Sequence, residues 1–162
     1  MNTDCRALSG RISQTFPDLE QVVGRTEFLM KKAVQNSDDG YLDGVALNLH
    51  SFYTGVERIL EDIARTMEKS IPSGSNWHQS LLLQMSAGIS SVRPPVISRE
   101  TRHCLDEYRA FRHVVRNVYT FHLKSSRLQE LSQQLRECFL SLRSDLEKFA
   151  SFLEQLAEDE GS

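Results

Sequence analysis

Apolar residues along most of the chain recur every three or four positions, the spacing that places them on one face of an α-helix. The clearest run extends from Leu42 to Met67 and predicts a long helix. A second run, from Leu128 to Leu156, is so regular that it resembles a coiled-coil seam and predicts packing along another long helix. The sequence contains no run in which apolar and polar residues alternate as they do in a strand.

The N-terminal stretch shows the same spacing between Ile12 and Ala33, with Pro17 inside it. A proline at this point suits either a kink or the first turn of a new helix. The polar segment 36–40 marks the end of this helical stretch.

Two breaks divide the middle of the chain, the loop SIPSGSN at 70–76 and the segment 88–95. Asn76 is a candidate N-cap for a short helix that follows the first break. After the second break, Ser98 is placed to start a helix that extends to about Val118.

These elements predict an all-α fold, an up-and-down bundle of about five helices of which two or three are long. A length of 162 residues suits a single domain that spans 1–162, with an acidic end that we expect to fray from about residue 157. No apolar run is long enough to span a bilayer, and the first residues lack the apolar core of a signal peptide. We therefore expect a cytoplasmic protein without a membrane partner.

The three cysteines, Cys5, Cys104 and Cys138, are an odd and scattered set. They lack the paired spacing of a zinc site or of a disulfide framework, which predicts reduced, partly buried thiols and no metal. The sequence also lacks a glycine-rich phosphate loop, a nucleophile elbow and an HExxH motif, so P-loop nucleotide hydrolysis is excluded and no cofactor is expected.

The net charge of −3 hides an uneven distribution. Eight basic and three acidic residues lie between Arg93 and Arg127, which gives this segment a local charge of +5. The densest part runs from Tyr108 to Leu123 and carries Arg109, Arg112, His113, Arg116, Asn117, Tyr119 and His122. One interpretation is a surface helix whose arginines pair with Asp106, Glu107 or an acidic neighbouring helix.

The other interpretation is an RNA-cleaving site. On a helix Arg112, Arg116 and Tyr119 lie within roughly 60° of one another, where the guanidinium groups can hold a phosphate. A nearby histidine can take a proton from a ribose 2′-hydroxyl or deliver one to a leaving oxygen. These groups suffice for RNA cleavage without a metal.

The segment RHVVRNVY at 112–119 resembles the signature of HepT-like ribonuclease toxins of the HEPN family, in which an arginine is followed by four residues, a histidine, one residue and a tyrosine. The similarity extends over most of 43–131. It implies a helical bundle that forms a homodimer, with the two motif helices meeting to build one RNA-cleaving site. It also implies a nucleotidyltransferase antitoxin as partner, which adenylylates the motif tyrosine.

In this resemblance Arg112 matches the motif arginine and Tyr119 the motif tyrosine, which makes Tyr119 the candidate for modification. The histidine position holds Asn117, whose amide cannot serve as a general acid or base. One replacement is His113, one helical turn earlier and about 40° away around the helix. Since positions five apart lie about 140° around a helix, Arg112 and residue 117 converge only if the helix ends there or a second subunit contributes.

A second replacement is the pair Arg116 and His122, which has the looser arginine-to-histidine spacing that HEPN domains sometimes show. With these replacements, the first hypothesis is a metal-independent endoribonuclease toxin. Asn117 instead favours a non-catalytic HEPN protein that binds RNA, nucleotide or a protein partner, so whether the protein is an enzyme stays open. A third hypothesis, an interaction bundle without a link to nucleotides, draws on the leucine seam and the acidic end.

Three further residues receive structural interpretations. Glu57 is expected to form local ion pairs within its own helix. His78, at the junction of a loop and a helix, is expected to cap that helix or to hydrogen-bond to a neighbouring one, without a catalytic role. Tyr53 is expected at the edge of the core.

Overall fold

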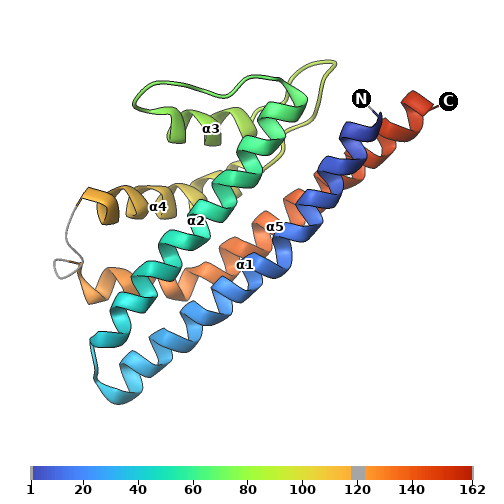
Figure 1. Ribbon diagram of the computed structural model, residues 1–162. Coiled ribbons are helices and arrows are strands. Elements are labelled where there is room, and N and C mark those ends of the chain that lie inside the picture. Colours follow the sequence, from blue (N-terminus) through green and yellow to red (C-terminus); the bar gives the residue numbers. More distant parts are fainter. Residues whose placement is uncertain (1, 118–122, 162) are drawn as a thin grey trace.

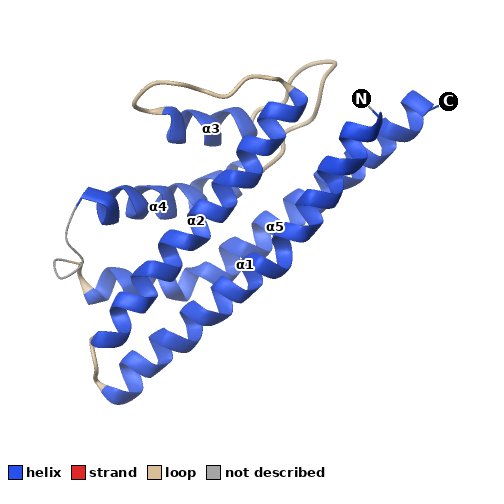
Figure 2. Ribbon diagram, in the orientation of Figure 1, coloured by secondary structure: helices blue, strands red, loops and turns tan. Residues whose placement is uncertain are grey.

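The structure is a computed structural model, and it describes residues 2–117 and 123–161. These residues form helices and loops without a strand, which confirms the predicted all-α class (Figure 2). In chain order the helices are α1 (Asn2–Asn36), α2 (Gly40–Met67), α3 (Trp77–Met85), α4 (Arg99–Asn117) and α5 (Ser125–Gly161).

The two longest helices, α1 and α5, run antiparallel to each other, so both chain ends lie at the same end of the molecule (Figure 1). Helix α2 packs on both of them. The shorter helices α3 and α4 contact α2 and each other, and α4 also contacts α5. This arrangement places α4, the helix with the dense basic segment, between α2 and α5.

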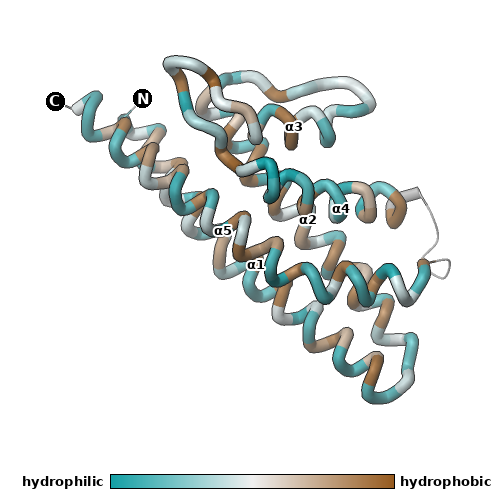
Figure 3. The backbone as a smooth tube through the Cα atoms, turned by 180° about the vertical axis from the view of Figure 1, so that it is seen from behind, coloured by the Kyte–Doolittle hydropathy of each residue, from teal (hydrophilic) through white to brown (hydrophobic). Residues whose placement is uncertain are grey.

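The core lies where the apolar faces of all five helices meet, and Figure 3 shows apolar and polar residues alternating around the helices. Two glycines of α2 let α1 approach closely. A Cβ atom added at Gly44 would lie 2.9 Å from Leu29 Cδ1, and one at Gly55 would lie 3.0 Å from Leu19 Cδ2. A side chain at either position would require Leu29 or Leu19 to move.

The structure corrects three expectations of local structure. Pro17 lies inside one continuous helix α1, so a new helix does not start there. Helix α1 also begins earlier than the apolar spacing indicated, at Asn2. Asn76 is the N-cap of α3, but its side chain makes no capping hydrogen bond, and the Trp77 N–H binds the Gly74 carbonyl instead.

The acidic end, expected to fray, belongs to α5, which continues to Gly161. Ala157 is completely buried there, so packing against α1 holds this end in place. Among the described residues, no helix combines the length and the apolar character that a bilayer span requires.

Candidate functional site

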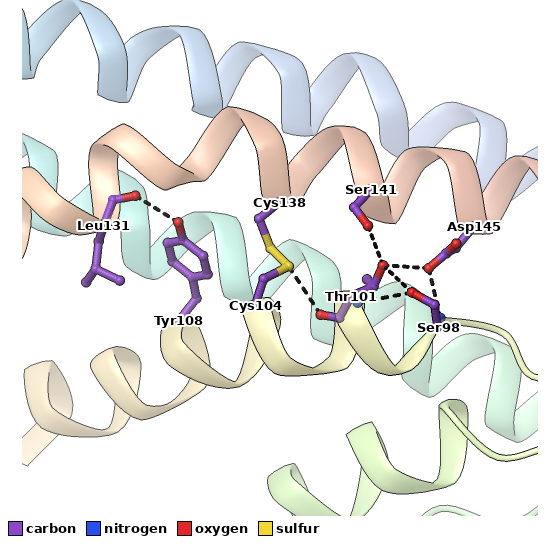
Figure 4. The surroundings of a disulfide bond; sticks show 8 residues. All are labelled: Ser98, Thr101, Cys104, Tyr108, Leu131, Cys138, Ser141 and Asp145. Carbon is purple, nitrogen blue, oxygen red and sulfur yellow. Dashed lines mark hydrogen bonds between the residues drawn. A yellow bond between two sulfur atoms is a disulfide. The ribbon is translucent and has the colours of Figure 1, made fainter.

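Helix α4 is fixed at its N-terminal end by a capping network (Figure 4). The Thr101 N–H donates to the Ser98 hydroxyl at 3.1 Å, as in a capping box, which confirms that Ser98 starts the helix. Asp145 of α5 accepts from the Ser98 N–H at 2.9 Å and from the Thr101 hydroxyl at 2.6 Å. A carboxylate of one helix thus stabilises the positive end of another.

About one turn after Thr101 on α4, a disulfide joins Cys104 to Cys138 of α5, with 5.9 Å between their Cα atoms (Figure 4). The expectation of reduced thiols at these positions is therefore wrong, whereas Cys5 is a free, buried cysteine. The docking of α4 on α5 brings together two residues that are 34 positions apart. The Tyr108 hydroxyl adds a hydrogen bond of 2.8 Å to the Leu131 carbonyl.

Arg112 lies on another face of α4, away from α5, where α4 packs against α2. Its Nη1 donates to Glu57 Oε1 at 2.8 Å. Only 9% of Arg112 and 3% of Glu57 is exposed, so the ion pair is buried. A buried pair of this kind holds its two helices in one register, because removing one partner leaves an uncompensated charge.

The second carboxylate oxygen of Glu57 is also engaged. His78 of α3 places Nδ1 at 2.7 Å from Oε2. An ionised carboxylate only accepts hydrogen bonds, so Nδ1 carries the hydrogen and donates it. The expectation that His78 contacts a neighbouring helix is confirmed, and Glu57 joins α2, α3 and α4 through one side chain.

Tyr53 lies one turn before Glu57 on α2 and is 1% exposed. Arg112 Cζ is 5.7 Å from the centre of its ring, within the range of a cation–π contact. The Tyr53 hydroxyl has no hydrogen-bond partner among the described residues. Burial, together with the nearby Glu57 carboxylate, raises the pKa of Tyr53 far above its ordinary value, so the phenol keeps its proton.

These side chains surround a pocket of about 160 Å³ between α2, α3 and α4. Besides the loop before α3, its lining consists of Tyr53, His78, Gln79, Arg109, Arg112 and His113. The predicted site residues Arg112 and His113 thus meet in one pocket.

Arg109 behaves as the surface-helix interpretation predicted. Its Nε donates to Asp106 Oδ1 at 2.6 Å, one turn earlier on the same helix. Arg112 instead contacts a neighbouring helix, and its partner is the buried Glu57. Neither arginine is an isolated surface charge.

The remaining predicted site residues lie at or beyond the end of α4. Arg116 and Asn117 form its last residues, and their side chains are outside the described set. Tyr119 and His122 fall within 118–122, which is also outside the described residues. The roles assigned to these four residues stay predictions.

A family model described as HepT-like protein matches residues 44–153, about two thirds of the chain. The chain belongs to the HepT-like family. The match confirms the resemblance to the HepT-like branch of HEPN proteins. It covers α2, α3, α4 and most of α5, whereas α1 lies outside it. No curated protein and no solved structure matches this HepT-like chain.

The opposite side of α4 in this HepT-like protein carries an apolar groove. Its walls are Ala110, Phe111, Val114, Leu123, Lys124 and Arg127. Val114, which is 43% exposed, lines this groove beside Phe111. The groove lies on the helix that carries the family motif.

Sequence reasoning missed the central position of Glu57. It assigned this residue to ion pairs within α2, whereas the carboxylate binds Arg112 on α4 and His78 on α3. The available signal was its place in the apolar stripe, directly after Val56 and three positions before Leu60. A charged residue inside such a stripe is buried, and a buried charge needs a partner.

Proposed function

We propose that this HepT-like protein is a metal-independent endoribonuclease that acts as a homodimer and as the toxin of a toxin–antitoxin pair. The match to the HepT-like family model carries the proposal, and the buried pair of Arg112 and Glu57 narrows the choice of catalytic residues. This pair bears directly on the asparagine at the histidine position of the family motif.

Arg112 is fixed between two helices by a buried carboxylate and is only 9% exposed, so it is poorly placed to clamp a scissile phosphate within a continuous RNA strand. The fixed position of Arg112 favours Arg116 and His122 as the catalytic pair. If Arg116 is the motif arginine and His122 the motif histidine, then Asn117 is not at the histidine position, and the arginine and the histidine of the motif are both present. The proposed nuclease therefore keeps an imidazole that can transfer protons.

In the proposed reaction, the 2′-oxygen of a ribose attacks the adjacent phosphorus. His122 of one protomer takes the 2′-hydroxyl proton, and His122 of the other delivers a proton to the 5′-oxygen as the P–O5′ bond breaks. Arg116 stabilises the charge that develops on the phosphate oxygens. The products are a 2′,3′-cyclic phosphate and a 5′-hydroxyl end.

The apolar groove beside Val114 supports the homodimer. Exposed apolar side chains that form one patch are typical of protein interfaces. A second copy of α4 packed against this groove would bury Val114 and bring the two motif helices together. The composite site that the reaction needs follows from this contact.

The toxin role includes a nucleotidyltransferase antitoxin that modifies Tyr119, and a cytoplasmic location where the RNA substrate is present. Disulfides are rare in the reducing cytosol. The disulfide between Cys104 and Cys138 would then form only under oxidising conditions. To test this part, the protein is incubated with the purified antitoxin and analysed by mass spectrometry. We expect the transfer of one adenylyl group to wild type and none to Tyr119→Phe.

The main test is an RNA cleavage assay in the presence of a chelator. We expect Arg116→Ala and His122→Ala to lower the cleavage rate about 10²-fold or more, and the products to carry cyclic phosphate ends. Arg143→Ala, which removes an exposed arginine of α5, is the matched control and should cleave like wild type. Full activity of His122→Ala together with loss in His113→Ala would move the proton transfer to His113 and contradict the proposed pair.

A second candidate function is a non-catalytic HEPN protein that binds RNA, nucleotide or a protein partner. Asn117 favours it, since an amide can hydrogen-bond a phosphate but cannot move its proton. RNA binding by wild type without cleavage over a broad RNA panel would establish this function instead.

A further inference from the structure

The pocket between α2, α3 and α4 presents mainly hydrogen-bond donors. Among the described residues, the Arg109 guanidinium donates only through Nε and the Arg112 guanidinium only through Nη1. Each guanidinium group has five N–H donors in all. His78 and His113 add two imidazoles to the lining. The acidic groups beside the pocket, Glu57 and Asp106, are each bound to an arginine. A ligand rich in acceptor oxygens complements such a lining.

The Tyr53 hydroxyl gives this pocket the character of a built site. It is a buried donor at the wall of the pocket, and no described residue accepts its hydrogen. An unsatisfied buried polar group costs about 1–3 kcal/mol. Arg93 Nε and Glu68 Oε2 also lack a partner among the described residues, but only Tyr53 belongs to the lining of this pocket. An anionic oxygen in the pocket would accept this hydrogen bond.

The shape of the pocket favours a terminal phosphate group over a phosphate within a continuous RNA strand. Side chains from three helices and from the loop before α3 line it, with Tyr53 buried at its inner side. A phosphodiester continues in two directions and needs an open groove. A phosphomonoester ends in its free oxygens and carries a charge close to −2, which suits a pocket lined by arginines and histidines.

We propose that this pocket binds a phosphomonoester, the group present at the end of a phosphorylated RNA strand and on a free nucleotide. The Tyr53 hydroxyl and the Arg109 guanidinium donate to its oxygens, and Arg112, held in place by Glu57, contributes positive charge at the inner side. None of these residues belongs to the proposed cleavage pair of Arg116 and His122. Binding and cleavage are therefore separate properties.

The chain carries its own probe for this binding. Trp77 is its single tryptophan, and the centre of its indole lies 3.8 Å from the centre of the His78 ring. His78 lines the pocket. A ligand that displaces or polarises the imidazole should change the fluorescence of Trp77.

The experiment titrates the full chain at constant ionic strength and follows Trp77 fluorescence. Four ligands are compared, a short RNA with a 5′-phosphate, the same RNA with a 5′-hydroxyl, AMP and inorganic phosphate. We expect the 5′-phosphorylated RNA to bind at least about tenfold more tightly than the 5′-hydroxyl RNA. Equal affinity of AMP and 5′-phosphorylated RNA would identify a nucleotide site, and weaker binding of AMP would identify an RNA-end site.

Two tyrosine variants decide whether the pocket is responsible. Tyr53→Phe removes only the donor hydroxyl and should weaken binding of the phosphorylated ligand about tenfold. Tyr108→Phe removes a hydroxyl that binds the Leu131 carbonyl, outside the pocket lining, and should bind like wild type. Arg109→Gln should weaken binding further without removing a buried pair.

The proposal is overturned if the two RNAs bind equally well, or if Tyr53→Phe binds the phosphorylated ligand as tightly as wild type does. The same titrations on Arg116→Ala separate this proposal from the proposed nuclease. Retained binding with lost cleavage supports both proposals, whereas phosphate-dependent binding by a protein that never cleaves RNA supports the pocket alone.

Discussion

Two buried pairs of arginine and glutamate connect α2 to later parts of the chain, and they differ in their surroundings. Arg93 donates through Nη2 to Glu68 Oε1 at 2.7 Å, and its side chain is completely buried. The same guanidinium donates to the carbonyls of Gln84, Ala87 and Pro94. This pair fastens the loop between α3 and α4 to the end of α2.

The pair of Arg112 and Glu57 holds helices rather than a loop, and its free side opens on a pocket. The second carboxylate oxygen of Glu57 accepts a hydrogen bond from His78. The hydroxyl of Tyr53 beside it lacks an acceptor among the described residues. The two pairs therefore share residue types and burial but differ in what the arginine faces. Backbone carbonyls surround the Arg93 guanidinium, although Arg93 Nε and Glu68 Oε2 also lack partners among the described residues. Arg112 instead lines a cavity.

We expect the largest effect on stability from Arg93→Ala, which tests whether the pair of Arg93 and Glu68 is structural. It leaves Glu68 buried and three carbonyls without their donor, so we expect a loss of about 3–5 kcal/mol in the free energy of unfolding. Urea denaturation measures the loss. Arg143→Ala, which removes an exposed partner of Glu147, should cost at most about 1 kcal/mol. If Arg93→Ala lowers the free energy of unfolding by less than about 1 kcal/mol, the pair of Arg93 and Glu68 does not have the structural role assigned to it.

Removing the disulfide tests how firmly α4, the helix that carries Arg112, is held on α5. The bond between Cys104 and Cys138 spans 34 positions, and by loop-closure entropy its loss should lower the free energy of unfolding by about 3–4 kcal/mol. Denaturation with and without a reductant measures this loss. The double variant Cys104→Ala/Cys138→Ala should not respond to reductant. Hydrogen exchange should rise in α4 more than in the loop around Arg93, and the opposite order would contradict this assignment.

Alkaline pH tests the tyrosines beside each contact. Burial raises the pKa of both Tyr53 and Tyr108 above the value of about 10 that they have in the unfolded chain. Stability is therefore complete below pH 10 and falls above it, by about 1.4 kcal/mol per pH unit for each group. Phenolate absorbance should show these two tyrosines ionising only as the protein unfolds. Ionisation of both before unfolding would contradict the burial.

The smallest effect separates the two hydroxyls. Tyr108→Phe removes a hydrogen bond to the Leu131 carbonyl and should cost about 1 kcal/mol. Tyr53→Phe removes a hydroxyl without a described partner and should leave stability unchanged or raise it slightly. Thermal denaturation in phosphate-free buffer measures both. A larger loss for Tyr53→Phe than for Tyr108→Phe would show that the Tyr53 hydroxyl has an acceptor.

The helices were largely predictable because the spacing of apolar residues is a local property. The runs around Leu49 and Leu142 lie on α2 and α5, and both residues are completely buried. Ser98 starts α4 as its side chain predicts. The first turns of α1 escaped prediction because packing against α5, rather than a strong local pattern, accounts for their burial at Cys5 and Leu8.

The contacts between distant residues could not be predicted in the same way. The disulfide and the pair of Glu57 and Arg112 join positions 34 and 55 residues apart. Their partners are determined by how α4 docks between α2 and α5, and spacing along one helix carries no information about docking. The sequence did single out Arg112 and His113, because the density of basic residues on one helix is a local feature, and the two residues line one pocket.

The adjacent chain ends have a consequence for the order of the helices. A Cβ atom added at Gly161 would lie 3.3 Å from Asn2 Nδ2, so a short linker can join the two ends. A circular permutant that begins at Gly40 and ends at Asn36 would place α1 after α5, as the second arm of a helical hairpin. The segment that matches the HepT-like family would then lie ahead of α1 in the permuted chain. Because α1 packs along both α2 and α5, the permutant would keep these contacts while changing the place of α1 in the chain.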